Sequence, residues 1–136
     1  MIYLLDTNAC IQYLVRRSSP VAARMATIPR QEVVLCDVVK AELYYGAYKS
    51  SRQSDNLDLF EDFFGEFLSL PFDGKAAKIY GEVRASLERK GTPIGSYDLQ
   101  IAAIALTHNL TLVTHNTREF SRVDGLRLED WEAENP

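Results

Sequence analysis

Four oxygen-bearing side chains stand beside apolar segments of this sequence, in places where an α/β protein binds its ligands. They are Asp6, Glu42, Asp98 and Asn116. Carboxylates that converge in one cleft repel each other unless a cation joins them, and ligand sets made only of oxygen suit Mg²⁺ or Mn²⁺. Zinc is disfavoured because no Cys or His residues have the spacing of zinc ligands. A cation held in this way activates water and stabilises a pentacovalent phosphate, which is the chemistry of phosphodiester hydrolysis.

Each of these acids also has a structural explanation. Asp6 follows a buried apolar run and precedes two small polar residues, so it can simply cap the next helix. Glu42 is the stronger functional candidate, because it lies among apolar helix neighbours and a buried carboxylate needs a partner. Asp98 lies in the first turn of a helix, whose dipole keeps it ionised. Asp37 ends the second apolar run and is interpreted as an N-cap, in preference to a metal ligand.

The elements that must position these side chains follow from hydrophobic patterning. Short apolar runs without alternation are typical of strands buried on both faces. The expected strands are Ile2–Leu5, Val33–Cys36, Leu68–Leu70, Leu110–Val113 and Leu126–Leu128. The expected helices are Ala9–Arg17, Val21–Ile28, Val38–Lys49, Leu57–Leu68, Gly74–Lys90 and Tyr97–His108. Three of them are expected to be capped: the second by the serine before Pro20, the fifth by Asp73 and the sixth by Ser96. This alternation predicts an α/β fold, a three-layer α/β/α sandwich with about five parallel strands and right-handed crossovers.

In such a sheet the strands before Asp6 and Asn116 are expected to be neighbours. The two side chains would then flank the topological switch point, where open α/β sheets bind ligands at the carboxyl ends of their strands.

Length and composition limit the classes of function. The 136 residues suit one domain, 1–136. Fifteen basic and nineteen acidic residues give a net charge of −4, which excludes binding of nucleic acid by bulk charge alone. Cys10 and Cys36 lie in apolar segments and are expected to be buried free thiols in a reducing compartment. Neither a signal peptide nor a membrane segment is recognisable, so a soluble, cytoplasmic protein is expected.

Two successive helices are rich in aromatic residues. The stripe of Phe60, Phe63, Phe64 and Phe67 has helical spacing and is interpreted as facing the core. Because Tyr44, Tyr45 and Tyr48 come just before it, the alternative is an exposed groove for a partner. Gly46 lies one turn after Glu42 and is expected to let another backbone approach closely.

Four motifs, in this order, resemble those of the PIN-domain ribonucleases. They are Leu4–Asn8, Lys40–Leu43 with Gly46, Ile94–Gly95 with Asp98–Ala103, and Leu112–Asn116 with Glu119–Phe120. Nearly the whole chain, including Gly125–Leu126 and Trp131, is similar to VapC-type toxins of bacterial toxin–antitoxin pairs. Each motif alone is weak, but the four together, correctly ordered and spaced, are specific.

The resemblance implies a single PIN domain with five parallel strands in the order 3-2-1-4-5. It further implies an Mg²⁺- or Mn²⁺-dependent endoribonuclease that cuts RNA, is blocked by a cognate antitoxin and forms a homodimer. Asp6, Glu42 and Asp98 match the metal-binding acids of the family. The fourth position is often acidic there, and here it is Asn116, which can hold water or phosphate but adds no charge. The antitoxin is expected to dock across the aromatic helices around Tyr45 and Phe64.

Two other functions stay open at this point. A PIN-type module that binds RNA or protein without catalysis is compatible with Asn116. A phosphoryl-transfer enzyme with Asp6 as nucleophile expects a second Asp where Asn8 stands. Secondary roles, in orienting ligands or in turns and caps, are assigned to Thr7, Asn8, Thr114, His115 and His108. The sequence does not identify the RNA, the antitoxin or the number of metal ions.

Overall fold

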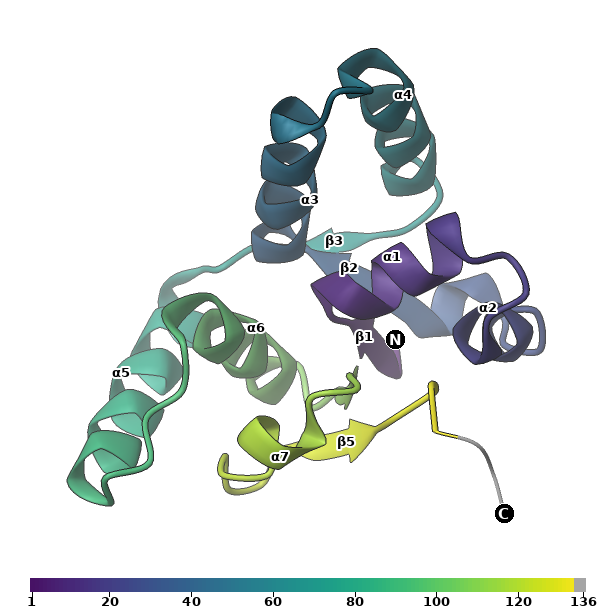
Figure 1. Ribbon diagram of the computed structural model, residues 1–136. Helices are drawn as coiled ribbons and strands as arrows, with labels where there is room; N and C mark the ends of the chain where they lie inside the picture. Colours follow the sequence, from purple (N-terminus) through teal and green to yellow (C-terminus); the bar gives the residue numbers. More distant parts are fainter. Residues whose placement is uncertain (134–136) are drawn as a thin grey trace.

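A five-stranded parallel sheet forms the centre of the molecule, in a computed structural model that describes residues 1–133 (Figure 1). Its strands are β1 (Tyr3–Leu5), β2 (Val33–Cys36), β3 (Ser69–Leu70), β4 (Thr111–Val113) and β5 (Arg127–Glu129). Their order is β3-β2-β1-β4-β5. In the central strand, Leu4 is in register with Val34 on β2 and Leu112 on β4. The predicted fold class and strand order are both confirmed.

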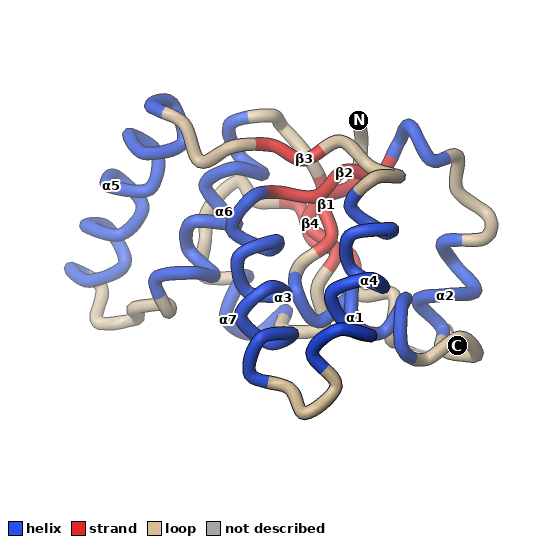
Figure 2. The backbone as a smooth tube through the Cα atoms, turned by 90° about the horizontal axis from the view of Figure 1, so that it is seen from above, coloured by secondary structure: helices blue, strands red, loops and turns tan. Residues whose placement is uncertain are grey.

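Helices flank the sheet in two groups. They are α1 (Thr7–Val15), α2 (Pro20–Met25), α3 (Asp37–Lys49), α4 (Gln53–Phe64), α5 (Gly74–Arg89), α6 (Ser96–Thr107) and α7 (Thr117–Phe120), with a 3-10 turn at Arg30–Glu32. From β1 the chain moves to one edge of the sheet at β3 and then returns to add β4 and β5 on the other side of β1. With right-handed crossovers, the helices before β3 and those after it therefore lie on opposite faces of the sheet. Figure 1 shows α1 to α4 grouped apart from α5 to α7, and Figure 2 shows the strands between the helices.

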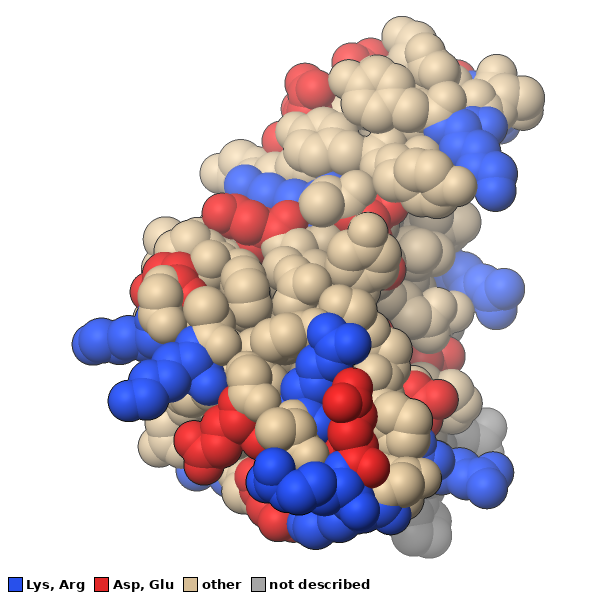
Figure 3. All heavy atoms as spheres, turned by 90° about the vertical axis from the view of Figure 1, so that its left-hand side faces the viewer, with Lys and Arg blue, Asp and Glu red and all other residues tan. Residues whose placement is uncertain are grey.

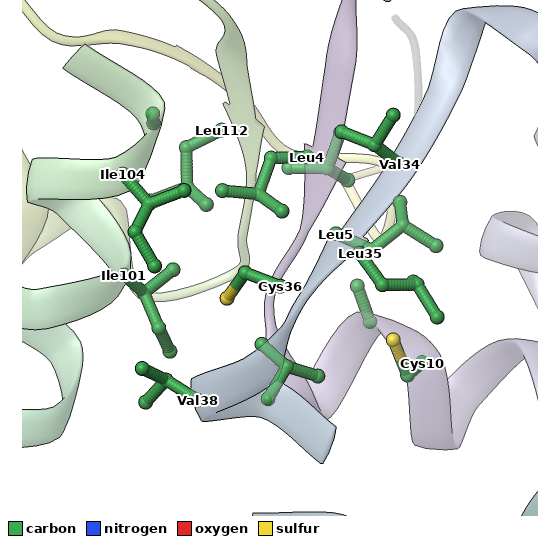
Figure 4. Close-up of a cluster of buried hydrophobic side chains, with 14 of the residues drawn as sticks. Leu4, Leu5, Cys10, Val34, Leu35, Cys36, Val38, Ile101, Ile104 and Leu112 are labelled. Atoms are coloured by element: carbon green, nitrogen blue, oxygen red, sulfur yellow. The ribbon is translucent and has the colours of Figure 1, made fainter. Parts of the chain in front are cut away.

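The core lies between the sheet and these helices. Leu4, Leu35 and Leu112 on three adjacent strands are 0% exposed. Ile101 and Ile104 of α6 face Leu4 and Leu112, while Leu35 points to the other face of the sheet, where α1 lies (Figure 4). Each side chain of this kind contributes about 1.5–3 kcal/mol on burial. This packing fixes the carboxyl ends of β1 and β4, and Asp6 and Asn116 follow these strand ends in the chain.

The caps at three helix starts are as predicted. Asp6 caps α1 by accepting a hydrogen bond from Ala9 N at 2.8 Å. Ser19 caps α2 through Ala22 N, and Asp73 caps α5 through Ala76 N. A side-chain oxygen in this position satisfies a backbone N–H that the helix leaves free.

The caps predicted for α3 and α6 are wrong. Asp37 and Ser96 are the first helical residues, and neither helix has a side-chain hydrogen bond at its N-cap. Partners on other elements hold the two side chains instead. Asp37 Oδ1 accepts a hydrogen bond from Ser69 Oγ at 2.6 Å, and Ser96 Oγ lies 3.1 Å from the Tyr80 hydroxyl. Asp37 therefore fastens the short strand β3 and stands outside the candidate metal site.

The phenylalanine stripe faces the core, as interpreted from its spacing. All four of its members are at most 8% exposed: Phe60, Phe63, Phe64 and Phe67. Phe64 packs edge to face on Tyr44 and is buried, so the alternative of an exposed groove that includes Phe64 is wrong. On α3, Tyr45 is 65% and Tyr48 59% exposed. A side chain at Gly46 would meet nothing within 4 Å, so the expected close backbone approach is also wrong.

The last described segment is anchored to the first strand. Trp131 is buried and its ring meets that of Tyr3 edge to face, with centroids 5.2 Å apart. Cys10 and Cys36 are buried free thiols, as expected. Within residues 1–133, no helix has the length and apolar character needed to cross a membrane.

Candidate active site

The carboxylate of Asp6 is enclosed at the carboxyl end of β1. The residue is 7% exposed, and its side chain accepts hydrogen bonds from Ala9 N and the Thr114 hydroxyl. Burial is the main reason that the pKa of Asp6 is nevertheless raised to about 6, and the negative charges of Asp98 and Glu132 contribute to this rise. Two hydrogen bonds therefore do not compensate for the lost hydration of this anion. A bound cation would supply the missing stabilisation.

Glu42 and Asp98 approach Asp6 from two helices. The Thr7 hydroxyl, at the start of α1, donates to Glu42 Oε1 on α3 at 3.0 Å. Asp98, in the first turn of α6, has a raised pKa because it is partly buried and because Glu42 and Glu119 lie near it. Its pKa responds to these charges although the N-terminus of a helix favours an anion. The three predicted acids are therefore electrostatically coupled in one region.

Asn116, in the loop after β4, and Glu119, in α7, lie beside these acids. Asn116 N donates to Thr114 Oγ1 at 3.0 Å, and Asn116 Nδ2 donates to Glu119 Oε2 at 3.1 Å. Glu119 is an acid of the site that the sequence reasoning left without a role. Its position in the same motif, one helical turn after Asn116, was the available signal.

Glu132 is a second acid that the sequence reasoning missed. It accepts a hydrogen bond from Asn8 Nδ2 at 3.1 Å, across 124 residues of sequence. No local pattern could have paired these residues, because the sheet alone brings the two ends of the chain together. His115 lies in the same area, with Nδ1 3.0 Å from Asp130 Oδ2, and this hydrogen bond raises the pKa of His115. His108, by contrast, ends α6 as its C-cap, as expected.

A comparison with known proteins identifies the family of this chain. Residues 3–126 match the PIN domain. The chain belongs to the PIN-domain family. It is 40% identical over 129 residues to the tRNA(fMet)-specific endonuclease VapC of Shigella flexneri, covering 95% of this chain and 97% of that protein.

Solved structures of VapBC complexes resemble this PIN domain over nearly its whole length. The DNA-bound VapBC of Salmonella typhimurium superposes with a TM-score of 0.91 at 38% identity, covering 96% of this chain and 98% of that one. VapBC2 of Rickettsia felis, bound to a promoter DNA fragment, gives a TM-score of 0.87 at 35% identity, covering 96% and 99%. The chain is thus similar to VapC proteins in both sequence and fold.

The donor atoms of this PIN domain fit a hard divalent cation. In the described part of the chain, none of the four carboxylates Asp6, Glu42, Asp98 and Glu119 forms a salt bridge with Lys or Arg. All four donors are oxygens, with no thiolate or imidazole among them, which suits Mg²⁺ or Mn²⁺. The coupled, partly buried anions account for the raised pKa values and are what such an ion would neutralise.

The surface of this PIN domain carries mixed charge. On the face that Figure 3 shows, Lys and Arg side chains lie among Asp and Glu side chains. The whole chain has a net charge of −4. Recruitment of a polyanion by bulk charge is therefore weak, and local contacts must position an anionic substrate.

Proposed function

We propose that this PIN domain is a VapC-type toxin, an Mg²⁺- or Mn²⁺-dependent endoribonuclease that a cognate VapB-like antitoxin neutralises. The observation that carries the proposal is the convergence of carboxylates from β1, α3, α6 and α7 without a basic partner in the described chain. Such a group is costly to a fold, and a nuclease that binds a cation has a use for it. Family membership and the 40% identity to a VapC endonuclease add independent support.

In this proposal Asp6, Glu42 and Asp98 hold the cation. When bound, the ion supplies an activated water and charge stabilisation at the phosphate, so none of the three acids acts as a nucleophile. Thr7 orients Glu42 through their hydrogen bond. Asp6 is oriented by two hydrogen bonds at once, from Ala9 N and from Thr114.

Glu119 supplies the fourth negative charge that Asn116 lacks. Asn116 holds the Glu119 carboxylate by its amide, and the charge of Glu119 raises the pKa of Asp98. Among residues 1–133 the Asn116 side-chain oxygen has no hydrogen-bond donor, so it can accept a hydrogen bond from water or from a ribose hydroxyl. The pair therefore combines the charge of an acid with the neutral polar contact of an amide.

The substrate and partners follow from the relatives. The Shigella flexneri protein is named for cleavage of tRNA(fMet), so initiator tRNA is the first substrate to test for this chain. The solved VapBC structures contain an antitoxin, and we extend that partnership to this chain. A homodimeric, cytoplasmic toxin stays the expectation from the sequence. Because Phe64 is buried, the antitoxin surface is centred on exposed Tyr45 and Tyr48 of α3.

The deciding experiment is cleavage of a total RNA pool and of initiator tRNA by antitoxin-free protein. Reactions contain Mg²⁺, Mn²⁺ or EDTA, and compare the wild type with Asp6→Asn and Asp98→Asn. Asp37→Asn is the matched control, because Asp37 is exposed, pairs with Ser69 and is not among the charges that shift the pKa values of Asp6 and Asp98.

Cleavage that requires the metal, survives in Asp37→Asn and is lost in both other variants is the expected result. Cleavage that persists in EDTA, or in Asp98→Asn, contradicts the proposed chemistry. A folded wild type that cuts neither RNA would instead support the non-catalytic binding module.

A further inference from the structure

A second cluster of ligating side chains lies beside the four carboxylates, after β4 and β5. His115, Asp130 and Glu132 each place one ligand atom within 4.8 Å of the others. His115 Nδ1 lies 3.0 Å from Asp130 Oδ2 and 3.9 Å from Glu132 Oε2. Ligand atoms around one transition-metal ion lie about 3–3.5 Å apart, because each metal–ligand bond is about 2.0–2.2 Å long. Small rotations of the side chains therefore create a three-ligand site.

The backbone beneath this cluster is held in place. Glu132 N donates to Asp130 Oδ1 at 2.9 Å, which directs Oδ2 toward His115. Trp131, between the two acids in sequence, is buried and packs against Tyr3. Supporting contacts of this kind orient ligands before a metal binds and reduce the entropy lost on binding.

The charges of the cluster are unbalanced. The side chains of Asp130 and Glu132 are only 20% and 22% exposed, whereas that of His115 is 62% exposed. Among the described residues, His115 is the salt-bridge partner of both acids. A protonated His115 imidazole neutralises the negative charge of only one of these two largely buried carboxylates. A divalent ion bound beside a neutral imidazole would neutralise the charges of both. The exposed imidazole also leaves a path of entry from solvent.

We propose that His115, Asp130 and Glu132 bind a divalent transition-metal ion such as Zn²⁺ or Co²⁺, at a site next to that of Asp6, Glu42 and Asp98 that shares no ligand with it. The imidazole ligand gives this site its selectivity, because imidazole suits Zn²⁺ and Co²⁺ whereas Mg²⁺ prefers oxygen ligands. Glu132 also accepts a hydrogen bond from Asn8, so an ion here joins the end of the chain to the start of α1.

The experiment uses the two histidines of the chain as probes. The whole protein, labelled with ¹⁵N-histidine, is titrated with Co²⁺ in the presence of excess Mg²⁺, which occupies the all-oxygen site. One equivalent of Co²⁺ is expected to give the ring nitrogens of His115 the large shifts of a direct ligand and leave those of His108 without them. Calorimetry with Zn²⁺ under the same conditions measures affinity, without RNA, so the result is independent of nuclease activity.

Matched variants locate the ligands. His115→Asn and Glu132→Gln are expected to weaken Zn²⁺ binding by at least about tenfold. His108→Asn and Asp6→Asn are expected to retain the binding measured in excess Mg²⁺, and circular dichroism checks that each variant is folded. Wild-type affinity in folded His115→Asn, or absence of a ligand shift at His115, would overturn the proposal. Displacement of Co²⁺ from His115 by Mg²⁺ at comparable concentration would overturn it as well.

Discussion

Replacement of Asp6 by Asn separates the stability of the fold from the demands of the site. Asp6 caps α1 through Ala9 N, and Asn caps a helix equally well. The change therefore removes the buried charge and keeps the cap. We expect Asp6→Asn to stabilise the metal-free protein at neutral pH, although it abolishes the proposed cleavage.

The magnitude follows from the pKa of Asp6. Its ordinary value of 3.8 rises to about 6 in the folded protein, so ionisation at pH 7 costs the fold up to about 3 kcal/mol. The folded state binds the proton more tightly than the unfolded chain. Wild-type stability is therefore lost as pH rises from about 4 through about 6. A gain of about 1–3 kcal/mol for Asp6→Asn corresponds to about 4–10 °C in Tm for a chain of this size.

The assay is urea unfolding in EDTA at pH 4, 5, 6 and 7, followed by circular dichroism. The difference between Asp6→Asn and wild type should be near zero at pH 4 and largest at pH 7. Added Mg²⁺ should then stabilise the wild type more than the variant, since ligand binding favours the folded state. Comparing one variant with wild type at each pH cancels the titration of distant groups.

Asp73→Asn is the control, because Asp73 also caps a helix but is exposed. Its effect should be a few tenths of a kcal/mol at every pH. If Asp6→Asn is less stable than wild type at pH 7, or differs from it equally at pH 4 and pH 7, the electrostatic reasoning is refuted.

Three further outcomes are expected. Glu119→Gln keeps the hydrogen bond from Asn116 but removes the charge, and should reduce metal-dependent RNA cleavage by at least about tenfold; unchanged rates would remove Glu119 from the site. Tyr45→Glu with Tyr48→Glu should abolish co-purification of the antitoxin from a folded toxin, and intact complexes would move that surface elsewhere. Trp131→Ala should cost about 3–5 kcal/mol in urea unfolding, and a loss below about 1 kcal/mol would contradict its anchoring role.

Patterning predicted the fold because the three central strands, β2, β1 and β4, are largely buried on both faces. The run Val33–Cys36 is continuous and apolar, and it ends at Asp37, a polar residue that starts a helix. Helix boundaries were less predictable. The fourth helix begins at Gln53, before the predicted start at Leu57, because the exposed first turn of a helix needs no apolar residue.

The proximity of the candidate acids was predictable where local sequence carried it. Asp6, Glu42 and Asp98 lie in motifs that place them at strand or helix ends, and the structure brings them together. Glu132 was not predictable, because its partner Asn8 is distant in sequence and only the folded sheet joins them. Asp37 was misjudged for the same reason. A strand-end Asp suits a cap, but Ser69 on another strand competes for its carboxylate.

The position of β1 at the centre of the sheet has a consequence for the cell that makes this protein. This strand acquires its neighbour β4 only after the helices α1 to α6 between them have been translated, and Trp131 packs on Tyr3 later still. Asp6 thus leaves the ribosome long before Glu119 and the helix that carries it. An unfinished nascent chain therefore lacks a complete site. The proposed ribonuclease activity would therefore arise only after α7 has been translated.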